Sequence, residues 1–324
     1  MVLATLLVGG VTRLTHSGLS IVEWQPLLGA IPPLSEGDWL AVFAKYQQSP
    51  QYFKVNLHMT LEEFKFIFWW EWAHRLIGRL IGVVFFVPFA WFWSRGKLSR
   101  ELIPKLLGFF ALGGLQGAMG WHMVKSGLVD DPHVSQYRLA AHLGLAFLIF
   151  GLMWWTAWGL LASRVAAPSD SPLRKTQLVG AALVALLFVM VLSGALVAGT
   201  HAGLVFNTFP LMGDHFVPPD LLAYEPAWRN LFENQITIQF VHRMFAWFMF
   251  IAIFLYCWRA IVVASRVRRA ALMVVVMLII QVSLGIATLL NAVPVPLGAA
   301  HQVGAMVLFA LLLYLNHALR VTQC

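Results

Sequence analysis

Four histidines inside apolar segments are the residues of this chain best suited to chemistry. His74 and His142 lie in its first half, and His242 and His301 lie in its second. Histidines from two facing helices can bind a haem iron from both sides. A lone histidine in an apolar helix is more often a core residue. Four in matching positions, where burying an ionisable group is costly, favour two haem sites.

Two of these histidines stand in related motifs that differ in charge. The first reads Glu-Trp-Ala-His-Arg at 71–75, and the second reads Gln-Phe-Val-His-Arg at 239–243. A residue three positions before a histidine shares its helix face. Glu71 could orient His74 or move protons, whereas Gln239 cannot ionise. We therefore hypothesise that the first half holds the reaction site and the second half a permanent electron-carrying haem.

Three arginines follow these histidines along the same helices, namely Arg75, Arg79 and Arg243. A buried guanidinium needs an anion, and haem propionates would accept from it in bidentate geometry. A helix-to-helix ion pair or snorkelling to the interface is the alternative. We predict that the three arginines contact propionates. His16 and His201 also match between the halves, but both fall at helix ends, where turn or capping roles are expected.

The composition requires that these residues be positioned within a membrane. Of the 324 residues 60% are hydrophobic and 11% charged, and the mean hydropathy is +0.77. Soluble domains carry about a quarter charged residues. The net charge of +8 comes from short loops, which indicates membrane orientation rather than nucleic-acid binding. Cys257 and Cys324 form no Cys-x-x-Cys pair, which argues against an iron–sulfur cluster, a zinc site or covalent haem attachment.

Spanning helices must carry the four histidines. A span takes about 20 apolar residues, and seven segments qualify: 66–93, 102–123, 137–162, 176–199, 236–262, 270–290 and 297–319. An eighth apolar run begins at Met1 and reaches only about Val11, so we expect the true start to lie upstream.

The loops between these segments predict the topology. Basic residues gather in the loops around 94–105, 163–175 and 259–269, including Arg164, and acidic residues, including Asp130 and Asp131, balance the opposite loops. By the positive-inside rule, the basic loops and both termini are cytoplasmic.

An internal repeat relates the two halves. The motif Thr-His-Ser-Gly-Leu at 15–19 recurs as Thr-His-Ala-Gly-Leu 185 residues later, Pro26-Leu-Leu-Gly recurs as Pro210-Leu-Met-Gly, and Gln116 and Gly120 match Gln281 and Gly285. Four helices per repeat restore the chain direction, which predicts parallel repeats. We therefore predict an all-α integral membrane protein with eight transmembrane helices in two pseudo-symmetric four-helix bundles, residues 1–165 and 166–324. Gly113, Gly117 and Gly120 are expected to allow close helix packing.

These motifs resemble the haem A synthase family over essentially the whole chain. The likeness rests on the run from Gly9-Gly10-Val-Thr-Arg to Glu-Trp24, on the 71–75 motif and on the distal histidines. The chain has no cysteine between residues 12 and 65, so it is similar to the cysteine-free subgroup of proteobacteria and mitochondria.

The resemblance implies an enzyme that oxidises the C8 methyl of haem O to the formyl of haem A, through a hydroxymethyl intermediate, for cytochrome c oxidase biogenesis. It implies His74 and His142 as ligands of the substrate haem, His242 and His301 as ligands of one haem b cofactor, and Glu71 as the essential acid. Whether oxygen or water supplies the formyl oxygen stays open.

The family also implies a setting in the bacterial inner membrane among lipid. Haem O synthase and cytochrome oxidase assembly factors are the implied partners, while the electron donor is unknown and a homo-oligomer is left open. Two other functions remain: a di-haem b cytochrome that oxidises quinol, and a transporter built on parallel repeats. The cytochrome gives no reason for Glu71 opposite Gln239. The transporter predicts helices broken at mid-membrane.

Overall fold

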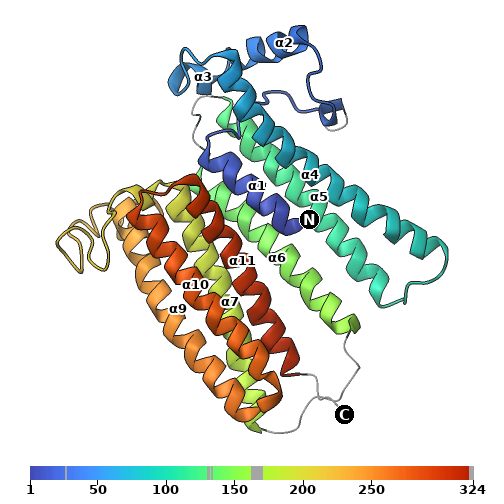
Figure 1. Ribbon diagram of the computed structural model, residues 1–324, viewed down its shortest axis with the longest axis vertical. Helices are drawn as coiled ribbons and strands as arrows, with labels where there is room; N and C mark the ends of the chain where they lie inside the picture. Colours follow the sequence, from blue (N-terminus) through green and yellow to red (C-terminus); the bar gives the residue numbers. More distant parts are fainter. Residues whose placement is uncertain (26–27, 130–131, 133, 162–170, 321–324) are drawn as a thin grey trace. The chain divides into compact units, whose positions relative to one another are not determined.

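The computed structural model describes residues 1–25, 28–129, 132, 134–161 and 171–320, and within these the chain is helical without named strands. Seven of the described helices are long and apolar enough to cross a membrane (Figure 1): α4 (Leu61–Ser94), α5 (Leu102–Gly127), α6 (Gln136–Leu161), α7 (Ser171–Gly199), α9 (Gln235–Val263), α10 (Arg268–Leu290) and α11 (Val295–Ala318). The predicted all-α, multi-pass membrane class is confirmed.

The eighth predicted helix is present but short. Helix α1 spans Val2–Leu14, which is 13 residues, and it carries buried Leu6 and Gly10. An eight-span architecture in two pseudo-symmetric bundles therefore stays a prediction. Four residues named in the sequence analysis lie outside the described residues: Pro26, Asp130, Asp131 and Arg164.

The chain divides into two compact units, Met1–Leu145 and Ala146–Cys324. This division falls inside α6, earlier than the predicted boundary after residue 165. Each unit contains two of the four candidate histidines, and the assignment of one haem to each half stays a prediction.

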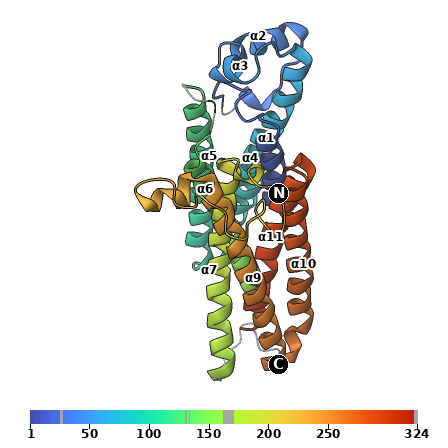
Figure 2. The same ribbon diagram turned by 90° about the vertical axis from the view of Figure 1, so that its left-hand side faces the viewer.

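In the first unit, α1 packs on α4 and α4 packs on α5. The segment before α4 holds the turn η1 (Leu28–Ala30) and two helices absent from the sequence-based prediction, α2 (Glu36–Tyr46) and α3 (Pro50–Lys54), which lie at the end of the unit where α4 begins (Figure 2). Ser35 and Asp38 form a capping box that begins α2. Thr60 and Glu63 form another, which begins α4 at Leu61 rather than at the predicted residue 66.

An aromatic cluster joins this segment to α4. Tyr46, Phe64 and Phe68 are buried in it, and the rings of Tyr46 and Phe64 lie 5.1 Å apart. Burial raises the pKa of Tyr46 to about 12. Tyr46 Oη accepts from Asn56 at 2.7 Å and lies 3.2 Å from Gln51 Oε1, so the polar end of this buried ring is satisfied. Such packed aromatics fix the segment that holds α2 and α3 against the start of α4.

In the second unit, α7 packs on α9, α10 packs on α11, and α11 also contacts α7. Helix α11 buries one face through residues such as Leu308, Leu312 and Leu315. Short elements connect the spans: η2 (Ala202–Leu204), η3 (Ala227–Arg229), α8 (Asn230–Glu233) and η4 (Ser265–Val267). Asn230 anchors the long connection before α9 by accepting from the backbone N–H of Tyr224 and donating to its carbonyl.

One packing expectation is wrong. A Cβ added at Gly113 or Gly117 would meet none of the described atoms within 4 Å, so these glycines are not points of close helix approach. Gly120 does lie in a close contact, and its neighbour is the ring of His142.

Candidate functional site

The four histidines form two pairs, one in each unit. His74 of α4 lies within electrostatic reach of His142 of α6, and His242 of α9 lies within reach of His301 of α11. All four sit in long apolar helices, several residues from the helix start. The structure thus brings together the two histidines of each half, while their role as haem ligands stays a prediction.

A glycine lies against the Cε1 edge of each ring. A Cβ built on Gly9 would be 2.6 Å from Cε1 of His74, and one on Gly194 would be 3.3 Å from Cε1 of His242. The distances are 3.2 Å from Gly120 to His142 and 2.9 Å from Gly285 to His301. Any larger residue would press on the imidazole, so glycine lets a neighbouring helix reach the ring.

A glutamine holds the second histidine of each pair. Gln116 donates to the carbonyl of His142 at 3.1 Å, and Gln281 donates to the carbonyl of His301 at 3.0 Å. The same amide nitrogens lie 3.3 Å from His142 Nε2 and 3.2 Å from His301 Nδ1. Both amides therefore fix the turn of helix that carries the histidine.

The first histidines of the two pairs differ in their surroundings. Ser193 Oγ lies 2.6 Å from His242 Nδ1. No comparable side chain contacts His74 Nδ1 among the described residues, and that atom is buried without a side-chain partner.

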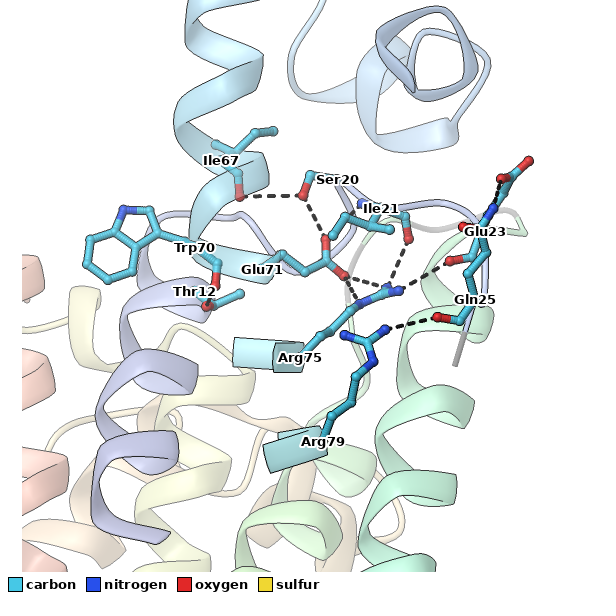
Figure 3. Close-up of polar contacts among 10 residues, drawn as sticks. All are labelled: Thr12, Ser20, Ile21, Glu23, Gln25, Ile67, Trp70, Glu71, Arg75 and Arg79. Carbon is cyan, nitrogen blue, oxygen red and sulfur yellow. Dashed lines mark hydrogen bonds and ion pairs between the residues drawn. The ribbon is translucent and has the colours of Figure 1, made fainter. Parts of the chain in front are cut away.

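Glu71 is buried one helical turn before His74, with 2% of its surface exposed. Its Oε2 accepts from Ser20 Oγ at 2.7 Å and from the backbone N–H of Ile21 at 2.8 Å. Its Oε1 accepts from Arg75 Nη2 at 2.6 Å (Figure 3). The carboxyl group is therefore fixed in place by a hydroxyl, a backbone N–H and a guanidinium.

Arg75 and Arg79 bind the chain segment that follows α1. Arg75 donates to the carbonyls of Ile21 at 2.9 Å and Glu23 at 3.2 Å, and Arg79 donates to the carbonyl of Gln25 at 3.0 Å (Figure 3). We name the contacts of residues 71 and 75 with residues 20–23 the first clamp.

The second unit contains a matching arrangement without a carboxylate. Arg243 donates to the carbonyls of Phe206 at 2.8 Å, Thr208 at 2.9 Å and Leu211 at 3.2 Å. Gln239 donates to the carbonyl of Phe206 at 3.0 Å and is also 2% exposed. We name these contacts the second clamp. Phe206 and Thr208 follow Ile21 and Glu23 by 185 residues, the spacing of the repeat.

The arginines have partners other than the predicted propionates. Glu71 supplies the anion that Arg75 needs, and backbone carbonyls accept from Arg243. The ion pair of Arg75 lies within one helix, because Glu71 and Arg75 both belong to α4. Contact of Arg75, Arg79 and Arg243 with propionates stays a prediction.

His16 and His201 end their helices in the same unusual conformation. Their φ angles are 53° and 57°, in the left-handed region that few non-glycine residues adopt. The His16 carbonyl accepts from Gln51 at 2.8 Å, which ties the turn to α3. The expectation of a turn role agrees with this geometry.

Sequence reasoning missed Ser193, the histidine contacts of Gln116 and Gln281, and the role of Gly9. The repeat offset carried a signal for the first, because Ser193 aligns with Val8 just as Gly194 aligns with Gly9. The carbonyl partners of the arginines had no signal, since backbone acceptors leave no mark in the sequence.

The donor sets fit haem rather than a bare metal ion. Among the described residues no three or more His, Cys, Asp or Glu side chains gather as metal ligands. A haem supplies four ligands from its own ring and takes one or two from the protein. Two partly buried histidines from different helices, each with a glycine against its ring, match that requirement.

Comparison with known proteins gives a consistent result over the whole chain. A family model described as cytochrome oxidase assembly protein, COX15-CtaA, matches residues 1–313. A protein of Nitrosospira multiformis named heme A synthase is 55% identical over 323 residues, which is 99% of this chain and 90% of that protein. Proteins with the same name from Nitrosomonas eutropha and Parvibaculum lavamentivorans are 51% and 49% identical, over 97% and 98% of this chain and 89% and 91% of their own lengths.

Proposed function

Because this chain belongs to the COX15-CtaA family of cytochrome oxidase assembly proteins, we propose that it is a haem A synthase. It is an oxidoreductase that converts haem O to haem A by oxidising the C8 methyl group to a formyl group. The observation that carries this proposal is a pair of partly buried histidines with a buried carboxylate, Glu71, one helical turn away, an arrangement that the described residues form in the first unit and not in the second.

The substrate haem O binds in the first unit, between His74 and His142. One haem b binds in the second unit, between His242 and His301, and supplies electron transfer when bound. Gln116 and Gln281 hold the backbone carbonyls of His142 and His301, so these two histidines would bind a haem from fixed turns of helix.

Glu71 supplies the charge that distinguishes the substrate site. Oxidation of the methyl group takes two stages, each of which adds one oxygen atom from dioxygen or water and removes two electrons from the carbon. The first stage gives the hydroxymethyl group, and the second gives a geminal diol that loses water to form the formyl group. A fixed carboxylate one turn from His74 stabilises positive charge that develops there and accepts a proton through its Ser20 contact. Arg75 pairs with this carboxylate at 2.6 Å and holds it in place.

The membrane setting follows from the helices and loops. The chain lies in the bacterial inner membrane, with both termini and the basic loops on the cytoplasmic side. Helix α1 forms part of an eighth span, and the repeat relates two four-helix bundles. Arg75, Arg79 and Arg243 also contact the haem propionates. Haem O synthase and cytochrome oxidase assembly factors are the partners of the chain.

Co-expression with a haem O synthase, followed by chromatography of the extracted haems, tests this function. We expect haem B together with hydroxymethyl and formyl products, and we expect His74→Ala to lose both products while keeping haem B. The exposed Glu62, which pairs with Lys65 on the same helix, provides the control variant Glu62→Gln. Haem B alone at two per chain would favour a di-haem cytochrome, and no haem would favour a transporter.

A further inference from the structure

Ser193 and Val8 occupy equivalent positions beside the first histidine of each pair. Each directly precedes the glycine that abuts the ring, Gly194 against His242 and Gly9 against His74. The spacing between Val8 and Ser193 is the 185 residues of the repeat. The two helices thus approach their histidines in the same way but offer different side chains.

In the second unit the serine hydroxyl contacts the ring directly. Ser193 Oγ lies 2.6 Å from His242 Nδ1 and 3.9 Å from Met190 Sδ. A serine hydroxyl both donates and accepts, so Oγ can accept from an imidazole that carries its proton on Nδ1. In that tautomer the lone pair of the ring is on Nε2.

In the first unit valine cannot take this role, because Val8 has no hydroxyl. His74 Nδ1 is buried with no side-chain hydrogen bond among the described residues. The ring of His74 is held by a hydrogen bond with the backbone of Thr5 in α1 and by the contact with Gly9, and no hydroxyl fixes its Nδ1.

We propose that Ser193 is a positioning residue that fixes the His242 ring with Nε2 as the iron-binding nitrogen, and that valine at position 8 makes His74 the more readily released ligand. This inference rests on the proposed function. Partners that fix a ligating histidine raise its basicity and its affinity for the metal. A cofactor that stays bound benefits from such a partner, whereas a substrate site must release its product haem after each turnover.

Release of haem from the purified full-length protein to excess apomyoglobin tests the first part. Ser193→Ala should release haem B about tenfold faster than the wild type, at the lower end of what loss of such a partner costs. The midpoint potential of haem b should rise, because a less basic imidazole stabilises ferric iron less. Ser193→Thr, which keeps a hydroxyl, should restore both values. Ser283, which makes no side-chain hydrogen bond within the described residues, provides the control Ser283→Ala.

Wild-type release and potential in Ser193→Ala would overturn the proposal, as would equal defects in Ser193→Ala and Ser193→Thr. The reciprocal variant Val8→Ser keeps the proposal testable if Ser193 variants accumulate poorly. It should slow the release of haem O or its oxidised products from the first unit, and unchanged release would count against the second part.

These outcomes differ from a failure of the proposed function. A protein that binds haem B in both units and makes no oxidised haem would contradict the synthase proposal. The effect of Ser193 on haem B release would still be measurable in that protein.

Discussion

The two clamps bind equivalent loops with different charge. In the first clamp Arg75 contacts the carbonyls of Ile21 and Glu23 and pairs with Glu71. In the second clamp Arg243 contacts the equivalent carbonyls and its helix neighbour is the neutral Gln239. The two arginines bind equivalent backbone carbonyls. The residue four positions before the arginine differs, since it is glutamate in the first clamp and glutamine in the second.

This difference indicates what the carboxylate is for. The second clamp holds its loop with an amide in place of an acid, so a negative charge is not required to bind such a loop. A buried ion pair is also weak support for stability, because desolvation offsets much of its attraction. We infer that the carboxyl group of Glu71 serves the reaction proposed beside His74.

The variant Glu71→Gln converts the first clamp toward the second, and it should have the largest effect. We expect product formation to fall roughly 10²–10⁴-fold, the usual contribution of a positioned acid or base. Haem b in the second unit should keep its spectrum. Haem chromatography and the reduced-minus-oxidised spectrum measure the two quantities.

The reverse change, Gln239→Glu, serves as the matched control. It should leave the oxidation chemistry of the first unit intact, because the new carboxylate would lie in the second unit, one helical turn before His242. Full activity in Glu71→Gln would remove the charge argument altogether.

Removing the arginine should lower the free energy of unfolding more in the first clamp than in the second. Arg75→Ala leaves Glu71 buried without its ion-pair partner and should lower the free energy of unfolding by about 3–5 kcal/mol. Arg243→Ala leaves only carbonyl groups without a donor, at about 1–3 kcal/mol. Thermal unfolding in detergent measures both, and equal losses would show that the ion pair adds nothing to the first clamp.

Replacing the glycine beside the first histidine of each pair should have a smaller effect on the free energy of unfolding, and this effect should differ between the two units. Gly9→Ala would put a methyl group 2.6 Å from His74 Cε1, whereas Gly194→Ala would put one 3.3 Å from His242 Cε1. We expect overpacking of about 1–3 kcal/mol for Gly9→Ala and less for Gly194→Ala. The reverse order in thermal unfolding would contradict this close approach of α1 to His74.

The smallest expected effect concerns the start of helix α2 in the first unit. Hydrogen bonds from Ser35 and from the backbone N–H of Leu34 lower the pKa of Asp38. Its contribution to the start of α2 is therefore complete above the ordinary carboxyl pKa of about 3.9 and is lost as the pH falls through the lower folded value. Hydrogen exchange of α2 should increase over that acidic range, and Asp38→Asn should flatten the increase. An unchanged acid profile in Asp38→Asn would show that another group controls this end of α2.

The spans were predictable because hydrophobic length alone defines them. The predicted segment 102–123 corresponds to α5 at Leu102–Gly127, and 236–262 corresponds to α9 at Gln235–Val263. The start of α4 was missed by several residues because its first turn is polar and is set by the Thr60–Glu63 capping box. Helices α2 and α3 were missed because they are short and packed by tertiary aromatic contacts.

The site was predictable in its residue types and less so in their contacts. The four histidines and the Glu71–Gln239 asymmetry stand in recognisable motifs. Burial of the Arg75 and Arg243 donors against loop carbonyls was not visible, because any sequence offers backbone acceptors. The serine beside His242 was recorded in the repeat, but only its 2.6 Å approach to Nδ1 gives it meaning.

The sequence by itself determined the membrane class, the repeat, the histidine pairs and the position where the halves differ in charge. These follow from hydrophobic length and residue type, which are local properties. Only the tertiary structure decided what surrounds the histidines: the glycine edges, the glutamine contacts, the two clamps and Ser193. Those contacts join residues 16 to 65 positions apart in the sequence, as from Gly285 to His301 and from Gly9 to His74, and packing of the folded helices sets them.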